Sequence, residues 1–236
     1  MHKLKLEFLP ICVLLFSFAI FAGEPEAKIT RVDGEASILR KGASRTRPVR
    51  INMPVSEGDE ISSGKESMVE LAFRMGEVVR MDENTILKVE KCTNKNVKAS
   101  TQVGNLWVNM KKLTQRRDFE VATPTAVAAI RGTIYHMSTD QDSTTAVSVY
   151  NGKVAVGLSE QLKKQLEQQP PTGEPVEVPG PEEIPGPYEV SLDQWRDIVA
   201  GQKISVHKDG KYAQEEFDME HNSSFIQKCI EYDTHR

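Results

Sequence analysis

The stretch TPTAVAAIRGT, residues 123–133, decides the fold of this chain. It joins an alanine-rich apolar run to a corner made of Arg131, Gly132 and Thr133, after which apolar and polar residues alternate again from Ile134. A glycine between two strand-like runs marks a bulge or a sharp bend, because it adopts positive φ without a Cβ clash. We therefore expect Arg131 and Gly132 to be structural, with the Arg131 guanidinium held by a carboxylate or a turn carbonyl. The alternative is that Arg131 binds an anionic ligand.

The sequence on both sides of this corner predicts an all-β fold. Alternation is clearest over residues 68–74, where it places Val69, Leu71 and Phe73 on one side of a strand. Between residues 27 and 157, turn signals separate the strand-like runs, and Asn151-Gly152 between two valine-rich runs is typical of a hairpin with a type I′ turn. Such a pattern indicates a compact, twisted β-sandwich or roll, or a short solenoid-like domain without a strict repeat.

The corner also carries a family resemblance. From Phe119 the pattern F-x-V-x-TP-x-A-x-x-x-I-RGT, which contains Thr123 and Pro124, resembles the signature of FecR-type periplasmic domains. Further pieces follow in the family's order: Val32-x-Gly34, Gly58-Asp59-x-Ile61, Ser67-x-Val69-x-Leu71-x-Phe73 and Val147-x-Val149-x-Asn151-Gly152-x-Val154-x-Val156. The resemblance covers about residues 27–157. It implies a compact, strongly twisted β-fold in a non-enzymatic, exported module that binds proteins or envelope components.

The first residues read as a secretory signal peptide. Basic Lys3 and Lys5 precede an apolar run over residues 11–22, which ends in small residues and is shorter than the roughly 20 residues of a membrane span. We expect cleavage near Ala22 and a periplasmic or secreted protein; the alternative is an uncleaved anchor. In the regulators that gave the family its name, the domain relays a signal from an outer-membrane receptor to a sigma factor. Only about ten residues precede the apolar run here, so we do not expect a sigma-binding domain before it.

Beyond residue 157 the composition changes twice. Residues 159–169 predict a helix whose single leucine stripe, Leu158, Leu162 and Leu166, is too thin for a core, so the helix docks lightly or stands in solvent. Residues 158–187 thus combine a helix-prone segment with a Pro/Glu-rich linker, since residues 170–187 hold seven prolines. Residues 188–236 form an accessory region, with strands near Ile204 that add to the main fold, Trp195 as a packing anchor and a short terminal helix over residues 222–232.

Neither charge nor motifs indicate catalysis or a cofactor. With 30 basic and 34 acidic residues the formal net charge is −4, which disfavours nucleic-acid and anionic-membrane binding. His136 is the one histidine of the β-region and is expected at a half-exposed strand position, and no nucleotide, metal or nucleophile motif is present. We therefore expect no catalytic, cofactor-binding or metal residues, although a cell-wall glycan hydrolase remains an alternative. Cys92 and Cys229 could form a disulfide in an oxidising envelope.

Two basic clusters stand out in this mildly acidic chain. The larger comprises Arg40, Lys41, Arg45, Arg47 and Arg50, and the second comprises Lys111, Lys112, Arg116 and Arg117. Each cluster has two interpretations. It either lies on a solvated loop without a function or forms a surface that binds an acidic partner or an anionic glycan. The expected function is an exported binding or scaffolding module in the cell envelope, with an envelope protein or glycan as partner and membrane contact only if the signal segment is uncleaved. The alternative is a membrane-anchored signal-relay regulator.

Overall fold

A computed structural model describes residues 25–110, 118–130, 132–168 and 195–235. These residues form two nine-stranded sheets and two helices, α1 (Glu160–Glu167) and α2 (Ser224–Thr234), so the all-β prediction is confirmed. The predicted signal peptide, the proline-rich linker, Arg131 and the Lys111–Arg117 cluster lie outside the described residues. Among the described helices, neither is long and apolar enough to cross a membrane.

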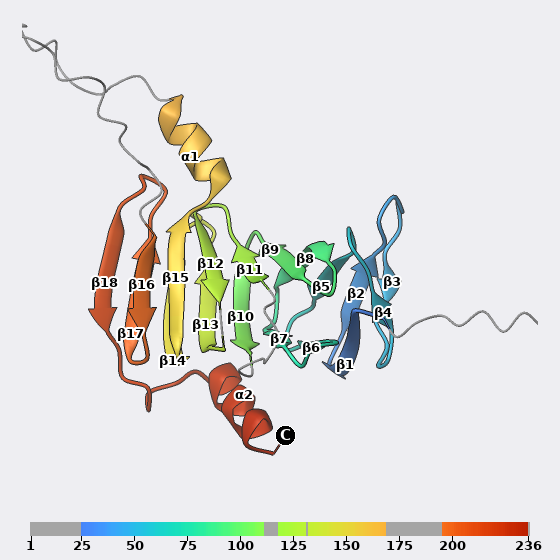
Figure 1. Ribbon diagram of the computed structural model, residues 1–236. Coiled ribbons are helices and arrows are strands. Elements are labelled where there is room, and N and C mark those ends of the chain that lie inside the picture. The colour runs from blue at the N-terminus through green and yellow to red at the C-terminus, as the bar shows by residue number, and fades with distance from the viewer. Residues whose placement is uncertain (1–24, 111–117, 131, 169–194, 236) are drawn as a thin grey trace, which may run out of the picture.

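The two sheets lie face to face as a sandwich (Figure 1). In spatial order, sheet A contains β18 (Tyr212–Glu216), β17 (Gln202–Val206), β14 (Thr145–Asn151), β13 (Ile134–Thr139), β10 (Gly104–Asn109), β7 (Val78–Met81), β6 (Met68–Phe73), β1 (Ala27–Asp33) and β4 (Pro54–Val55). Sheet B contains β16 (Arg196–Val199), β15 (Lys153–Leu158), β12 (Ala126–Ile130), β11 (Asp118–Ala122), β9 (Asn96–Thr101), β8 (Ile86–Cys92), β5 (Glu60–Ser63), β2 (Ala36–Leu39) and β3 (Arg47–Pro48).

The chain builds this sandwich progressively from one end to the other. Hairpins alternate between the sheets: β6–β7 lies in sheet A, β8–β9 and β11–β12 in sheet B, and β13–β14 in sheet A again. The colour in Figure 1 therefore runs in order across the molecule, from the blue strands at one end to the red strands at the other. All strand pairs are antiparallel except β9–β11, which is parallel.

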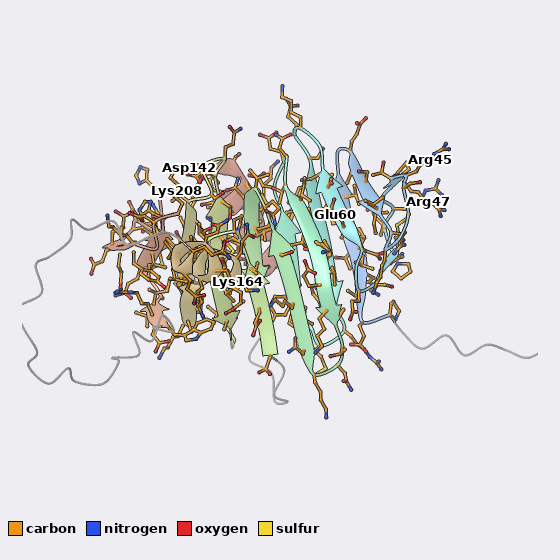
Figure 2. All side chains as sticks on the ribbon, turned by 90° about the horizontal axis from the view of Figure 1, so that it is seen from above. Arg45, Arg47, Glu60, Asp142, Lys164 and Lys208 are labelled. Atoms are coloured by element: carbon orange, nitrogen blue, oxygen red, sulfur yellow. The ribbon has the colours of Figure 1, made fainter. Side chains whose placement is uncertain are left out.

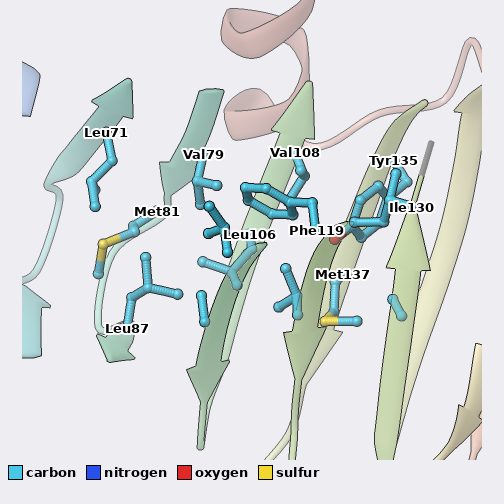
Figure 3. Packing of buried hydrophobic residues seen from close by; sticks show 14 of the residues in the cluster. Leu71, Val79, Met81, Leu87, Leu106, Val108, Phe119, Ile130, Tyr135 and Met137 are labelled. Carbon is cyan, nitrogen blue, oxygen red and sulfur yellow. The ribbon is translucent and has the colours of Figure 1, made fainter. Parts of the chain in front are cut away.

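The main core fills the space between the sheets. Leu71, Leu106 and Val108 of sheet A face Leu87 and Phe119 of sheet B, and all are at most 1% exposed (Figure 3). The predicted inward face of residues 68–74 is confirmed, since Val69, Leu71 and Phe73 are all buried in this core. Alternation found the correct face because successive strand residues point to opposite sides of a sheet.

The predicted hairpin at Asn151-Gly152 is wrong. β14 belongs to sheet A and pairs with β13 and β17, whereas β15 belongs to sheet B and pairs with β12 and β16. Gly152 has φ +84°, but Asn151 does not have the positive φ that a type I′ turn needs. This single glycine turns the chain from one sheet to the other. Valines flank it on both sides because both strands face the same core.

The C-terminal region returns to the sandwich, as expected. β16 extends sheet B, and β17 and β18 extend sheet A. Helix α1 begins at Ser159, whose hydroxyl accepts from the Leu162 amide, and Leu162 is only 1% exposed. With Leu166 also packed on the core, the leucine stripe docks α1 firmly at the rim of the sandwich, so the helix does not stand in solvent.

Candidate binding surface

Gly58 and Asp59 fix the loop that precedes β5. Asp59 is 2% exposed, and its Oδ2 accepts from Arg40 Nη1 at 2.6 Å and from the Ser56 amide at 2.8 Å. Its Oδ1 accepts from the Lys41 amide at 3.2 Å. Gly58 has φ +87°, and a Cβ there would lie 2.6 Å from the Lys41 side chain. Both residues are therefore used to hold the chain where it crosses from β4 to β5.

Thr123 and Pro124 belong to a group of buried threonines that joins the two sheets. Thr145 of sheet A is fully buried, and its hydroxyl lies 2.7 Å from that of Thr123 and 2.8 Å from that of Thr125. Thr125 donates to the Ser143 carbonyl at 2.7 Å, so it accepts from Thr145, while Thr123 donates to the Ala126 carbonyl at 3.1 Å. The Pro124 carbonyl accepts from the Ser159 hydroxyl at the start of α1. Sequence reasoning missed Thr145, because a single strand threonine carries no spacing signal.

Gly132 and Thr133 pack directly against Gly152. Gly132 has φ +63°, and a Cβ on Gly152 would lie 2.8 Å from the Gly132 carbonyl oxygen. The Thr133 hydroxyl is fully buried and donates to the Lys153 carbonyl at 2.7 Å. The turn between β12 and β13 therefore packs against the turn between β14 and β15. The predicted anchoring role of Arg131 stays a prediction, while the surrounding motif residues hold the sheet crossings.

The outer face of sheet B contains an open hollow of about 450 Å³. Its floor is made by Ala129 and Ala155, which lie opposite each other on β12 and β15. Charged residues flank this floor, since Glu120 lies opposite Ala129 and Asp197 lies opposite Ala155. The remaining lining residues are Asp118, Phe119, Ile130 and Lys153. Small side chains on the floor and long ones on the walls leave room for a protruding group of a partner.

The charges around the hollow are of both signs. Lys153 Nζ lies 2.6 Å from Asp197, and Lys98 Nζ lies 3.9 Å from Glu120. Next to the hollow, the Trp195 ring covers Gly157, where a Cβ would lie 3.2 Å from the ring, yet Trp195 remains 48% exposed. Trp195 thus packs as expected and also presents a large aromatic surface. Exposed aromatic side chains beside small apolar ones are typical of protein-binding surfaces.

The middle of the outer face of sheet A is instead covered by α2. Phe225, Ile226 and Cys229 of this helix form a second apolar cluster with Met68 of β6 and Trp107 of β10. His136 lies on the same face, with its ring centroid 6.4 Å from that of Phe225. Burial, together with the charge of Lys203, lowers the pKa of His136 to about 4, so its imidazole is neutral at pH 7.

A buried arginine holds α2 in place. Arg80 is fully buried on the outer side of β7, and its Nε donates to Glu70 at 2.7 Å and its Nη1 to Asp233 at 2.6 Å. The other Asp233 oxygen accepts from Trp107 Nε1 at 2.9 Å. Burial alone would lower the pKa of Arg80, but the hydrogen bonds and charges of Asp233 and Glu70 outweigh it and raise this pKa. Sequence reasoning missed this network, although a charged residue between Val79 and Met81 of a buried strand was a usable signal.

The remaining candidate groups lie apart. Cys92 is at the end of β8 in sheet B and Cys229 is on α2 over sheet A, and no disulfide joins them. Within the described ranges, no group of three or more His, Cys, Asp or Glu side chains is placed to hold a metal ion.

Comparisons with known proteins complete this description. Residues 59–155 match the family model described as FecR protein. No curated protein matches the sequence. A crystal structure at 1.65 Å of a candidate anti-sigma factor from Parabacteroides distasonis ATCC 8503 has a TM-score of 0.51 and 18% identity, over 71% of this chain and 64% of that one. A second structure of the same description, at 2.50 Å, has a TM-score of 0.48 and 18% identity, over 67% of this chain and 60% of that one. The chain therefore spans less than two thirds of either structure, and the first likeness supports the fold alone.

Proposed function

We propose, from the match of residues 59–155 to the FecR family model, that the protein is an exported, non-enzymatic binding module of the cell envelope. The observation that carries the proposal is the contrast between the two outer faces of the sandwich. Helix α2 packs on β6, β7 and β10 of sheet A, whereas sheet B presents an open hollow beside a half-exposed Trp195. The signal-peptide pattern over residues 1–22 supports export.

The chemistry of the hollow favours a protein partner. Ala129 and Ala155 offer a small apolar floor, while Glu120, Lys153 and Asp197 offer both acceptors and donors at its rim. A surface of mixed charge around a small apolar centre has the usual layout of a protein interface, with an apolar core and a polar rim. The motif glycines at the sheet crossings, Gly58, Gly132 and Gly152, do not line this hollow.

Affinity capture from envelope extract tests this function. The tagged wild-type protein is expected to retain a discrete envelope protein, identified by mass spectrometry. Ala129→Arg with Ala155→Arg fills the hollow from outward-facing positions and is expected to abolish capture. Ala146→Arg, a matched change on the outward face of sheet A, is expected to leave capture intact. Equal capture by all three proteins, or capture of no protein by the wild type, contradicts the proposal.

A second candidate is a signal-relay regulator that keeps its apolar residues 11–22 as a membrane anchor. It is favoured by the FecR domain and by the fold likeness to a candidate anti-sigma factor. N-terminal sequencing of the protein from envelope fractions separates the two candidates, because a chain that starts near Gly23 excludes the anchor. The non-enzymatic part of the proposal is tested with purified peptidoglycan, from which the protein is expected to release no soluble product.

A further inference from the structure

The end of the sandwich at β3 and β4 is strongly basic. Residues 40–53, which we term the basic end, contain five basic residues and no acidic one. Asp59 pairs with Arg40, and Glu57 pairs with Lys41. The other three, Arg45, Arg47 and Arg50, form no ion pair with any described residue. Arg45 and Arg47 point away from the body of the molecule (Figure 2). The excess positive charge of this loop is therefore available to a partner.

One stretch near the opposite end has the opposite charge, although Arg196, Lys203, Lys208 and Lys211 also lie in this region. Residues 214–220, which we term the acidic end, contain four acidic residues and no basic one. They comprise part of β18, the outermost strand of sheet A, and the residues that follow it. Glu215 pairs with Lys203 and Asp218 with His221, whereas Glu216 and Glu220 have no ion-pair partner in the described part of the chain.

Both ends also expose large apolar side chains. Ile51 in the basic end is 57% exposed, more than any other large apolar residue that the structure describes. Met219 in the acidic end is 43% exposed, and Val199 on β16, the outermost strand of sheet B, is 46% exposed. Each of these exposed side chains is available as the apolar part of a contact whose rim is charged.

We infer that the basic end of one molecule docks on the acidic end of a second copy, so that the protein associates head to tail. The charges of the two ends are complementary, and Ile51 supplies an apolar contact for Met219 or Val199. The contact joins two different surfaces, so it is heterologous and extends into a chain of molecules unless the geometry closes a ring. The edge strands β3 and β4 have two residues each and include Pro48 and Pro54, so the contact uses side chains and does not continue the sheets.

Sedimentation velocity of the full chain purified from expressing cells tests this inference. At low salt the mean mass is expected to rise with protein concentration, and high salt is expected to restore the monomer because it screens the charges. Arg45→Glu with Arg47→Glu and Arg50→Glu is expected to lower the association constant at least about tenfold, since like charges then face each other. Glu215→Lys with Glu216→Lys and Glu220→Lys is expected to do the same.

The mixture of these two variants supplies the decisive result. One retains the native acidic end and the other retains the native basic end, so the equimolar mixture is expected to associate although each variant alone stays monomeric. Lys91→Glu with Lys95→Glu and Lys228→Glu, which changes the net charge by as much as the arginine variant does at exposed sites away from the basic end, is expected to associate like the wild type. A wild type that is monomeric at every concentration in low salt, or a mixture that does not associate, overturns the inference. The test is independent of the envelope partner, so its failure leaves the proposed function standing.

Discussion

Arg80 of β7 donates to Asp233 of α2 at 2.6 Å, which joins residues that lie 153 positions apart in the sequence. The same carboxylate accepts from Trp107, and Arg80 also donates to Glu70. A fully buried guanidinium between two carboxylates, beneath an apolar helix, contributes stability only while all its partners are present. This network therefore makes the docking of α2 dependent on a few polar atoms.

Replacing Asp233 is expected to lower the free energy of unfolding much more than replacing Glu231 on the same helix. Asp233→Ala removes one of the two carboxylates from Arg80 and leaves Trp107 Nε1 without an acceptor, so we expect a loss of about 3–5 kcal/mol in the free energy of unfolding. Glu231→Ala, at an exposed position of α2, is expected to change it by less than about 0.5 kcal/mol. Denaturant titrations of both variants check this, and equal midpoints would contradict it.

Cys229 is expected to make stability fall at alkaline pH. Burial raises the pKa of its thiol to about 12, whereas the unfolded thiol ionises near its ordinary value of 9. The unfolded state therefore releases a proton that the folded state keeps, so stability decreases as pH rises above 9, by about 1.4 kcal/mol at pH 10. Unfolding titrations of wild type and Cys229→Ala between pH 7 and 10 measure this difference, since the variant lacks the thiol. Parallel pH profiles of the two proteins would refute the assignment.

Thr145 is expected to be intolerant of an isosteric apolar residue. Thr145→Val keeps the shape of the side chain but removes the hydroxyl between Thr123 and Thr125, and it leaves the buried Thr125 oxygen without the hydrogen bond that it accepts from Thr145. The expected loss is about 1–3 kcal/mol. Thr145→Ser retains the hydroxyl and loses only a methyl group, so it is expected to be the milder change. Thermal unfolding ranks the two variants, and a less stable serine variant would show that packing dominates at this site.

Gly132→Val is expected to be strongly destabilising. The residue has φ +63°, a conformation in which a β-branched side chain is strained, and its carbonyl lies against Gly152. We expect a loss of at least about 2 kcal/mol, seen as a lower melting temperature. Ala129→Val, a nearby change on the outward face of β12, serves as the control. An unchanged melting temperature in the glycine variant would disprove the structural role of this corner.

The features that could be predicted from sequence are those that depend on near neighbours. Alternation over residues 68–74 identified the buried face of β6, because each strand residue shares its face with the residue two positions away. The prediction of a hairpin at Asn151-Gly152 was wrong because a turn signal in the sequence indicates a bend but not which sheet the next strand joins. The contacts of Arg80 with Asp233 and of Thr145 with Thr123 depend on how distant strands are stacked, and no local pattern encodes that.

Because the strands of the sandwich are added in chain order, α2 differs from the rest of the fold in when it can dock. Strands are added in order from the β1 end to the β18 end, so most of the fold can form before the last residues are available. Among the described elements of the C-terminal region, α2 turns back to contact earlier strands, where it covers Met68, Trp107 and Arg80. A chain that stops before Ser224 would expose the apolar patch of Met68 and Trp107 and would leave Arg80 with Glu70 as its remaining carboxylate partner, which favours proteolysis. The helix thus makes the stability of the sandwich depend on the presence of residues 224–234.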